Sequence, residues 1–149
     1  MLFGDNRDQL RQMYRDALNK SESGQPMTAL ESQIADVIVQ HPEYRDAVIP
    51  PGAHAQDKLD RDYLPEAGEA NPFMHMSLHL AVRDQLATNR PNGIREAFAS
   101  LCASQDRHQA EHVLCEHMGR ELWQSQRDRK PPDEQRYLKG ILEQIARNG

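Results

Sequence analysis

Apolar residues recur along this chain at spacings of three and four residues, and no other feature of the sequence limits its fold as strongly. The pattern returns in five or six stretches, and nowhere do four or more apolar residues alternate at a spacing of two. A helix brings residues three and four apart onto one face, whereas a strand alternates its two faces. We therefore predict an all-α fold, a bundle of five to six helices.

Capping residues and helix breakers predict where these helices begin and end. Thr28 and Glu31 have the spacing of a capping box, and Pro42 stops the helix that they start. Asn71, directly before a proline, is a typical opening of another helix. The predicted helices cover residues 7–19, 28–41, 71–88, 94–101, 106–127 and 133–147. Residues 42–70 lack a sustained period, so we expect one long irregular loop or lid between the second and third helices.

Length and charge limit the organisation of the chain and its partners. A chain of 149 residues is expected to form a single domain, because a second core would have too few residues. The net charge of −5 provides no basic surface for nucleic acid or for an anionic membrane. No apolar run is long enough to cross a bilayer, and the first residues do not form a secretory leader. We therefore expect a cytoplasmic protein whose two cysteines are reduced.

The histidines carry the clearest chemical signal. Four of the seven form two pairs at a spacing of four residues, His75 with His79 and His108 with His112. On a helix this spacing stacks two side chains about 5 to 6 Å apart, a separation from which two imidazoles can reach one ion. Spacing alone is weak support, however, so the direction of each pair has to be considered.

Helical-wheel positions indicate that both pairs face the core. At about 100° per residue, the first pair falls on the apolar stripe of its helix. His108, Glu111 and His112 fall within the apolar arc of the long helix that follows. His117 falls on the opposite side of that helix, and we leave it out of the site.

Four inward-facing histidines predict a mononuclear metal site, because a divalent ion gives all of them a partner at once. The predicted ligands are His75, His79 and His112. His108 and Glu111 serve as a fourth ligand or as support for the ligands. Nitrogen ligands with one oxygen suit divalent Zn, Fe, Ni or Mn, and the affinity order alone does not choose among them. The alternative is that each histidine is a core residue hydrogen-bonded to a carbonyl or carboxylate group.

Three residues near this constellation have simpler explanations. His41 falls at a helix end and is expected to cap free carbonyl groups. Glu31 is explained by its place in the capping box, and Cys115 by the role of a small buried hydrophobic residue. We leave open whether any of the three joins the site.

Two classes of function are compatible with these residues. A metal-bound water of lowered pKa suits a hydrolase or a transferase, with Glu111 as general base and residues 42–70 as a lid. The alternative is a non-catalytic interaction module whose histidines are structural. In that case the amphipathic helix at 133–147 holds a protein partner or a second copy of the chain. The sequence identifies no substrate.

Several stretches together resemble a known family. They are MTALESQIADVIVQHPEY (27–44), DRDY (60–63), NPFMHMSLHLAVRDQ (71–85) and HQAEHVLCEHMGRELWQSQ (108–126). In combination they resemble a bacterial domain-of-unknown-function family, numbered eighteen forty-one. The resemblance implies a bacterial cytoplasmic protein and no particular reaction. A looser similarity, of fold alone, is to metal-dependent bundles typified by damage-inducible proteins, in which a His-x-x-x-His pair and one distant histidine hold an ion.

Overall fold

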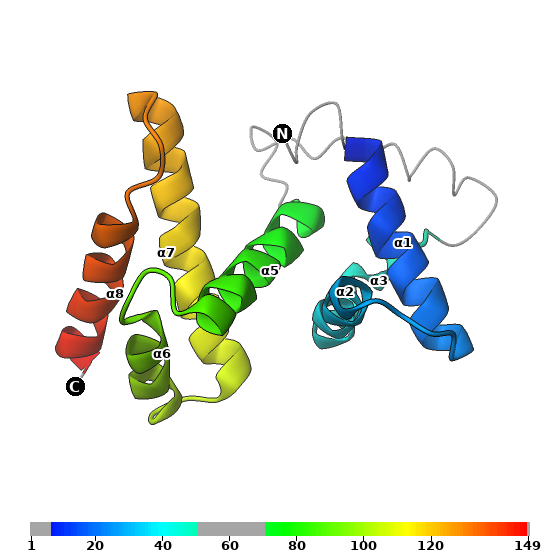
Figure 1. The fold of residues 1–149 in the computed structure, drawn as a ribbon, viewed down its shortest axis with the longest axis horizontal. Coiled ribbons are helices and arrows are strands. Elements are labelled where there is room, and N and C mark those ends of the chain that lie inside the picture. Colours follow the sequence, from blue (N-terminus) through cyan, green and yellow to red (C-terminus); the bar gives the residue numbers. More distant parts are fainter. Residues whose placement is uncertain (1–6, 51–70, 149) are drawn as a thin grey trace. The chain divides into compact units, whose positions relative to one another are not determined.

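The computed structural model describes residues 7–50 and 71–148, and every regular element in these two ranges is helical (Figure 1). The elements are α1 (Arg7–Ser23), α2 (Ala29–Gln40), the 3-10 helix η1 (Pro42–Tyr44), α3 (Arg45–Val48), α5 (Pro72–Thr88), α6 (Ile94–Cys102), α7 (Arg107–Asp128) and α8 (Glu134–Asn148). The predicted all-α class is confirmed. The described ranges contain seven α-helices, more than the five to six predicted. None of these helices is both long and apolar enough to cross a membrane.

The additional helix lies where the sequence predicted the start of an irregular loop. After α2, Pro42 begins η1 and the chain continues directly into α3, which buries Val48 completely. A proline is tolerated in the first turn of a helix because its missing N–H would have no helical partner there. The prediction treated Pro42 only as a stop signal and therefore began the loop too early. The remainder of the predicted loop, residues 51–70, lies outside the described residues.

Local contacts explain the ends of the first two helices. Thr28 Oγ1 accepts a hydrogen bond from the Glu31 N–H at 3.1 Å, and Glu31 Oε1 accepts one from the Thr28 N–H at 2.9 Å. The predicted capping box is thus confirmed, and Glu31 also pairs with Lys20 at 2.6 Å. α1 continues beyond its predicted end to Ser23, whose hydroxyl donates to the carbonyl oxygen of Asn19 at 2.7 Å.

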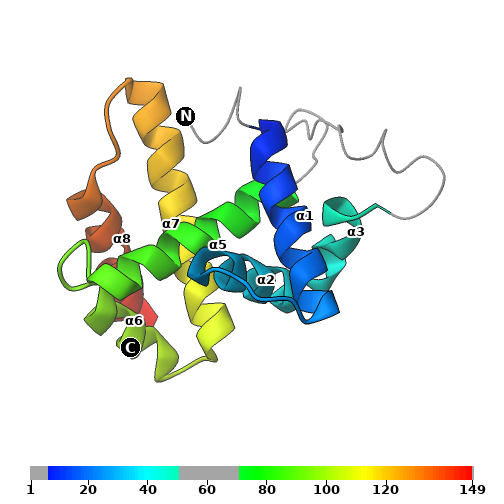
Figure 2. The same ribbon diagram turned by 45° about the vertical axis from the view of Figure 1, so that its right-hand side comes forward.

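Internal contacts divide the chain into two compact units, residues 1–76 and residues 77–149. In the first unit, α1 and α2 pack against each other (Figure 2). Tyr14 of α1 and Ile34 of α2 are almost completely buried. The boundary between the units falls inside α5, so the first turn of this helix belongs to the first unit and the remaining turns to the second.

The second unit combines most of α5 with α6, α7 and α8, and α7 and α8 lie side by side (Figure 1). Its core is a single cluster of buried side chains: Val82, Ile94, Ala97, Phe98, Leu101, Ala110, Leu114, Cys115, Tyr137, Leu138 and Ile141. Burying one large apolar side chain contributes roughly 1.5–3 kcal/mol. This cluster therefore holds in place the parts of α5 and α7 that carry His79, His108 and His112.

α8 is the amphipathic C-terminal helix that the sequence predicts. It buries Tyr137, Leu138 and Ile141, and the Tyr137 hydroxyl donates to Gln85 Oε1 of α5 at 2.6 Å. Leu142 continues the apolar spacing of this helix, which predicts an inward side chain, but it is 48% exposed. The buried arc from Tyr137 to Leu138 spans about 100°, and Leu142 lies about 40° beyond its edge.

Candidate metal centre

Three histidine side chains converge in the second unit. His79 comes from α5, and His108 and His112 come from the first two turns of α7. Each ring offers one nitrogen atom, and the three nitrogens all lie within 4.8 Å of one another. The structure therefore brings together three of the histidines that the sequence placed at one site.

The three rings pack directly against one another. The centroids of the His108 and His112 rings are 4.2 Å apart, as their spacing of four residues on one helix requires. The His79 ring is parallel to that of His108 at 5.3 Å and tilted by 64° from that of His112 at 4.8 Å. His79 has no exposed surface, whereas the two α7 histidines are half-buried. Solvent therefore reaches this group through His108 and His112.

A buried carboxylate orients His79. Glu111 of α7 is 2% exposed, and its Oε1 accepts hydrogen bonds from His79 Nδ1 at 2.8 Å and from Arg83 Nε at 3.0 Å. Burial acts to raise the pKa of Glu111, but the hydrogen bonds from His79 and Arg83 outweigh it and hold the pKa below its usual value. Glu111 is therefore ionised at neutral pH.

The charge of Glu111 fixes the tautomer of a neutral His79. An ionised carboxylate can only accept hydrogen bonds, so Nδ1 carries the proton and the lone pair of the ring lies on Nε2. Histidines that ligate metals commonly donate their other ring N–H to a carboxylate in this way. Nε2 is thus the His79 atom that an ion would use.

His75, the remaining predicted ligand, belongs to the first unit. Its ring centroid lies 5.0 Å from that of His41 and 5.9 Å from that of Tyr44, and its plane is steeply inclined to both. His41 is buried, and its Nδ1 donates to the carbonyl oxygen of Val37 at 2.8 Å. The predicted capping role of His41 is therefore confirmed, while the role of His75 as a ligand stays a prediction.

Sequence reasoning missed that α7 buries a second polar face. His117 lies about 180° around the helix from His108, yet it is only 8% exposed. Its Nε2 donates to Gln144 Oε1 of α8 at 2.7 Å. A Cβ atom at Gly140 would lie 3.1 Å from His117 Nδ1, so the missing side chain permits this close approach. The signal for the burial of His117 was a glycine, Gly140, within the amphipathic 133–147 helix.

Cys115 takes the structural role expected of it. Its side chain is part of the core of the second unit and is 2% exposed. Burial raises the pKa of the Cys115 thiol to about 12. At neutral pH the group is a protonated thiol, and not the thiolate that soft metal ions bind.

Comparison with known proteins adds a family but no activity. A protein-family model described as "Domain of unknown function (DUF1841)" matches residues 6–143, nearly the whole chain. The comparisons with curated proteins and with solved structures gave no match.

Proposed function

The chain belongs to the family described as a domain of unknown function (DUF1841), and we propose that its second unit binds one divalent transition-metal ion through His79, His108 and His112. The observation that carries the proposal is the convergence of three imidazole nitrogens from two helices within 4.8 Å. Histidine nitrogens bind zinc at about 2.0–2.1 Å, so two of them on one ion lie at most about 4.2 Å apart. Metal binding therefore requires the nitrogens to lie slightly closer together than the 4.8 Å limit of the present arrangement.

The surroundings of His79 support the proposal. Its hydrogen bond to Glu111 fixes the ring and makes Nε2 a stronger ligand, and Arg83 anchors Glu111 in turn. We assign Glu111 to this positioning role. Both of its hydrogen bonds end on Oε1, so Oε2 remains for the other roles predicted from the sequence, a fourth ligand or a general base.

Three nitrogen ligands leave room for chemistry at the ion. Catalytic zinc sites have three protein ligands and keep a fourth position for water or substrate. Zn, Fe, Ni and Mn in the divalent state all accept imidazole, and we propose an ion of this group. Such an ion lowers the pKa of bound water, which suits hydrolysis or group transfer. A cytoplasmic location and the participation of His75 stay predictions.

Metal content tests the proposal directly. The chain is purified without a histidine tag, incubated with Zn, Fe, Ni or Mn salts, desalted and measured by mass spectrometry. We expect about one ion per chain, and less than about 0.2 in the His79→Ala variant, because a buried ligand is lost. A wild-type ratio below about 0.2 after all four salts contradicts the proposal.

His117→Ala is the matched control, since it removes another buried histidine outside the site. We expect this variant to keep its metal. Its midpoint of thermal unfolding should fall, because the substitution opens a cavity against α8 and leaves Gln144 without its donor. Equal metal content in His79→Ala and His117→Ala would show that the three-histidine group is not the binding site.

The second candidate is a non-catalytic interaction module in which the histidines are structural. Two large apolar side chains of the second unit favour it, because Trp123 of α7 is 58% exposed and Leu142 of α8 is 48% exposed. Tryptophan is enriched among the residues that anchor protein interfaces. The two candidates differ in how the fold responds when metal is removed.

A further inference from the structure

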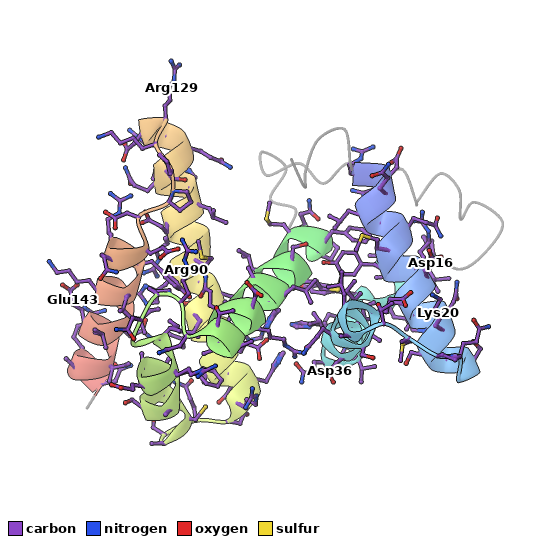
Figure 3. All side chains as sticks on the ribbon, viewed as in Figure 1. Asp16, Lys20, Asp36, Arg90, Arg129 and Glu143 are labelled. Atoms are coloured by element: carbon purple, nitrogen blue, oxygen red, sulfur yellow. The ribbon has the colours of Figure 1, made fainter. Side chains whose placement is uncertain are left out.

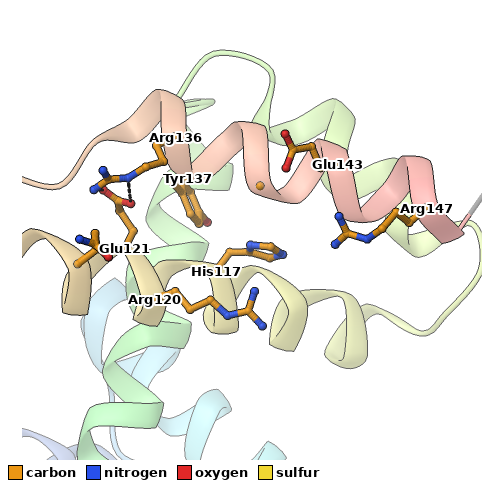
Figure 4. A pocket seen from close by; sticks show the side chains of 9 residues that line it. His117, Arg120, Glu121, Arg136, Tyr137, Glu143 and Arg147 are labelled. Carbon is orange, nitrogen blue, oxygen red and sulfur yellow. Dashed lines mark hydrogen bonds and ion pairs between the residues drawn. The ribbon is translucent and has the colours of Figure 1, made fainter.

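A surface cleft of about 300 Å³ lies between α7 and α8 (Figure 4). We call it the α7–α8 cleft. The residues that decide its chemistry are His117, Arg120, Glu121, Arg136, Glu143 and Arg147. None of them belongs to the proposed metal site, so the cleft is a separate chemical feature of the second unit.

The floor of the cleft is held in place by contacts between the two helices. His117 is 8% exposed, and its hydrogen bond to Gln144 fixes the ring against α8. Gly140 provides the space that the ring occupies, since a Cβ there would lie 3.1 Å from His117 Nδ1. The cleft is therefore built on two rigid elements and does not depend on a loop.

One end of the cleft is closed by an ion pair. Arg136 donates to Glu121 through Nε at 2.8 Å and through a terminal nitrogen at 2.7 Å. Glu121 is 4% exposed, and its Oε1 also accepts the backbone N–H of Asp133 at 2.8 Å. This pair joins α7 to the start of α8, and its two charges cancel.

Two arginines at the cleft have no such partner. Arg120 and Arg147 are exposed, and neither forms an ion pair with any residue in the described part of the chain. In Figure 4 the guanidinium groups of Arg120, from α7, and Arg147, from α8, both lie near the His117 ring. Glu143 lines the same region and opposes only one of these charges. This part of the surface is therefore positive, although the chain as a whole carries −5.

We propose that the α7–α8 cleft binds the phosphate group of a small ligand through Arg120 and Arg147. A guanidinium group is planar and donates two parallel hydrogen bonds to a phosphate, which makes arginine the preferred residue for this contact. A phosphate monoester has three terminal oxygens that can accept from two guanidinium groups at once, whereas a carboxylate has two. Free phosphate and a phosphate monoester share this chemistry, and both fit a cleft of about 300 Å³.

Titration of the full chain with phosphate, followed by NMR, tests this proposal. Inorganic phosphate is added at constant ionic strength, because salt screens exposed charges over about 10 Å. We expect saturable shifts of the His117 ring and Gly140 amide signals. Arg120→Gln and Arg147→Gln should each weaken binding by about tenfold or more. A parallel titration with methyl phosphate assigns the source, since the tighter of the two probes identifies an ester or free phosphate.

Two control variants sharpen the result. Arg129→Gln removes an exposed arginine at the end of α7, away from α8 (Figure 3), and should leave binding unchanged. Glu143→Gln removes the opposing charge and should strengthen binding. Shifts that do not saturate, or equal weakening by Arg129→Gln, would overturn the proposal. All four side chains are exposed, so circular dichroism should show unchanged folding. No metal is added, so this result is independent of the metal proposal.

Discussion

Glu111 connects two other side chains, His79 and Arg83, at the centre of the candidate site. It lies almost completely out of water and accepts hydrogen bonds from the fully buried His79 and from Arg83, which is 14% exposed. An ionised carboxylate in such surroundings is stable only with partners of this kind. The position of the His79 ring therefore depends on the charge of Glu111 as well as on its shape.

Glu111→Gln tests this dependence with little change in volume. The amide keeps one acceptor oxygen but loses the charge that strengthens the contact with His79, so we expect metal affinity to fall by about 10- to 100-fold. Competition with a coloured chelator measures the change. Arg83→Gln is the companion variant and should have a smaller effect, because it leaves the His79 contact in place. Unchanged affinity in Glu111→Gln would remove Glu111 from the site.

Residues whose environment is local were predictable, and residues whose environment comes from another helix were not. The capping roles of Glu31 and His41 follow from neighbours within four residues, and the structure confirms both. The burial of His117 depends on Gly140 and Gln144 of a different helix, and no helical wheel of α7 alone contains that information.

Among the elements, α8 shows how narrow the buried face of a surface helix is. Ile141 has no exposed surface, and the next residue, Leu142, is 48% exposed. Both are large aliphatic residues in the same turn, so composition and periodicity cannot distinguish them. The surface of the second unit against which α8 packs decides which of the two is buried.

Substitution of this adjacent pair measures the docking of α8. Ile141→Ala should lower the free energy of unfolding by about 2–5 kcal/mol, because it leaves a cavity in the core. Leu142→Ala should change it by less than about 0.5 kcal/mol. Urea unfolding followed by circular dichroism gives both values. Similar losses in the two variants would mean that α8 docks through a different face.

Helix boundaries were largely predictable, because the signals that set them lie next to them. α5 begins after Asn71, whose side chain accepts hydrogen bonds from the N–H groups of Phe73 and Met74. α7 begins after Asp106, whose side chain accepts a hydrogen bond from the Gln109 N–H. The helical turn after Pro42 was missed, because proline both ends one helix and begins the next. Nothing in the sequence marks the division inside α5, where Met76 and Ser77 are consecutive helical residues.

For the whole molecule, the proposed metal binding predicts that the free energy of unfolding depends on whether the ion is bound. A ligand that binds only the folded state adds about 2.7 kcal/mol when present at 100 times its dissociation constant. The chain has one tryptophan, Trp123 on α7, so its fluorescence follows unfolding of the second unit. We expect a chelator to lower the midpoint of thermal unfolding of the wild type by several degrees.

The His79→Ala variant is the reference for that experiment, since it has no site to empty and its midpoint should not respond to the chelator. An unchanged midpoint in the wild type would favour the interaction module with structural histidines. A midpoint that falls equally in both proteins would show that the chelator acts elsewhere. Comparison of the two proteins therefore separates the two candidate functions.

The burial of Cys115 allows thiol labelling to measure how often the core of the second unit opens. Thiol reagents attack only an accessible thiolate, and this side chain is 2% exposed with a pKa of about 12. Labelling of Cys115 therefore requires the core to open, and the labelling rate reports how often it opens. Cys102, half-buried at the end of α6, is more accessible and reacts sooner. The rate of the slower labelling phase thus reports how often the helices that carry the histidines separate.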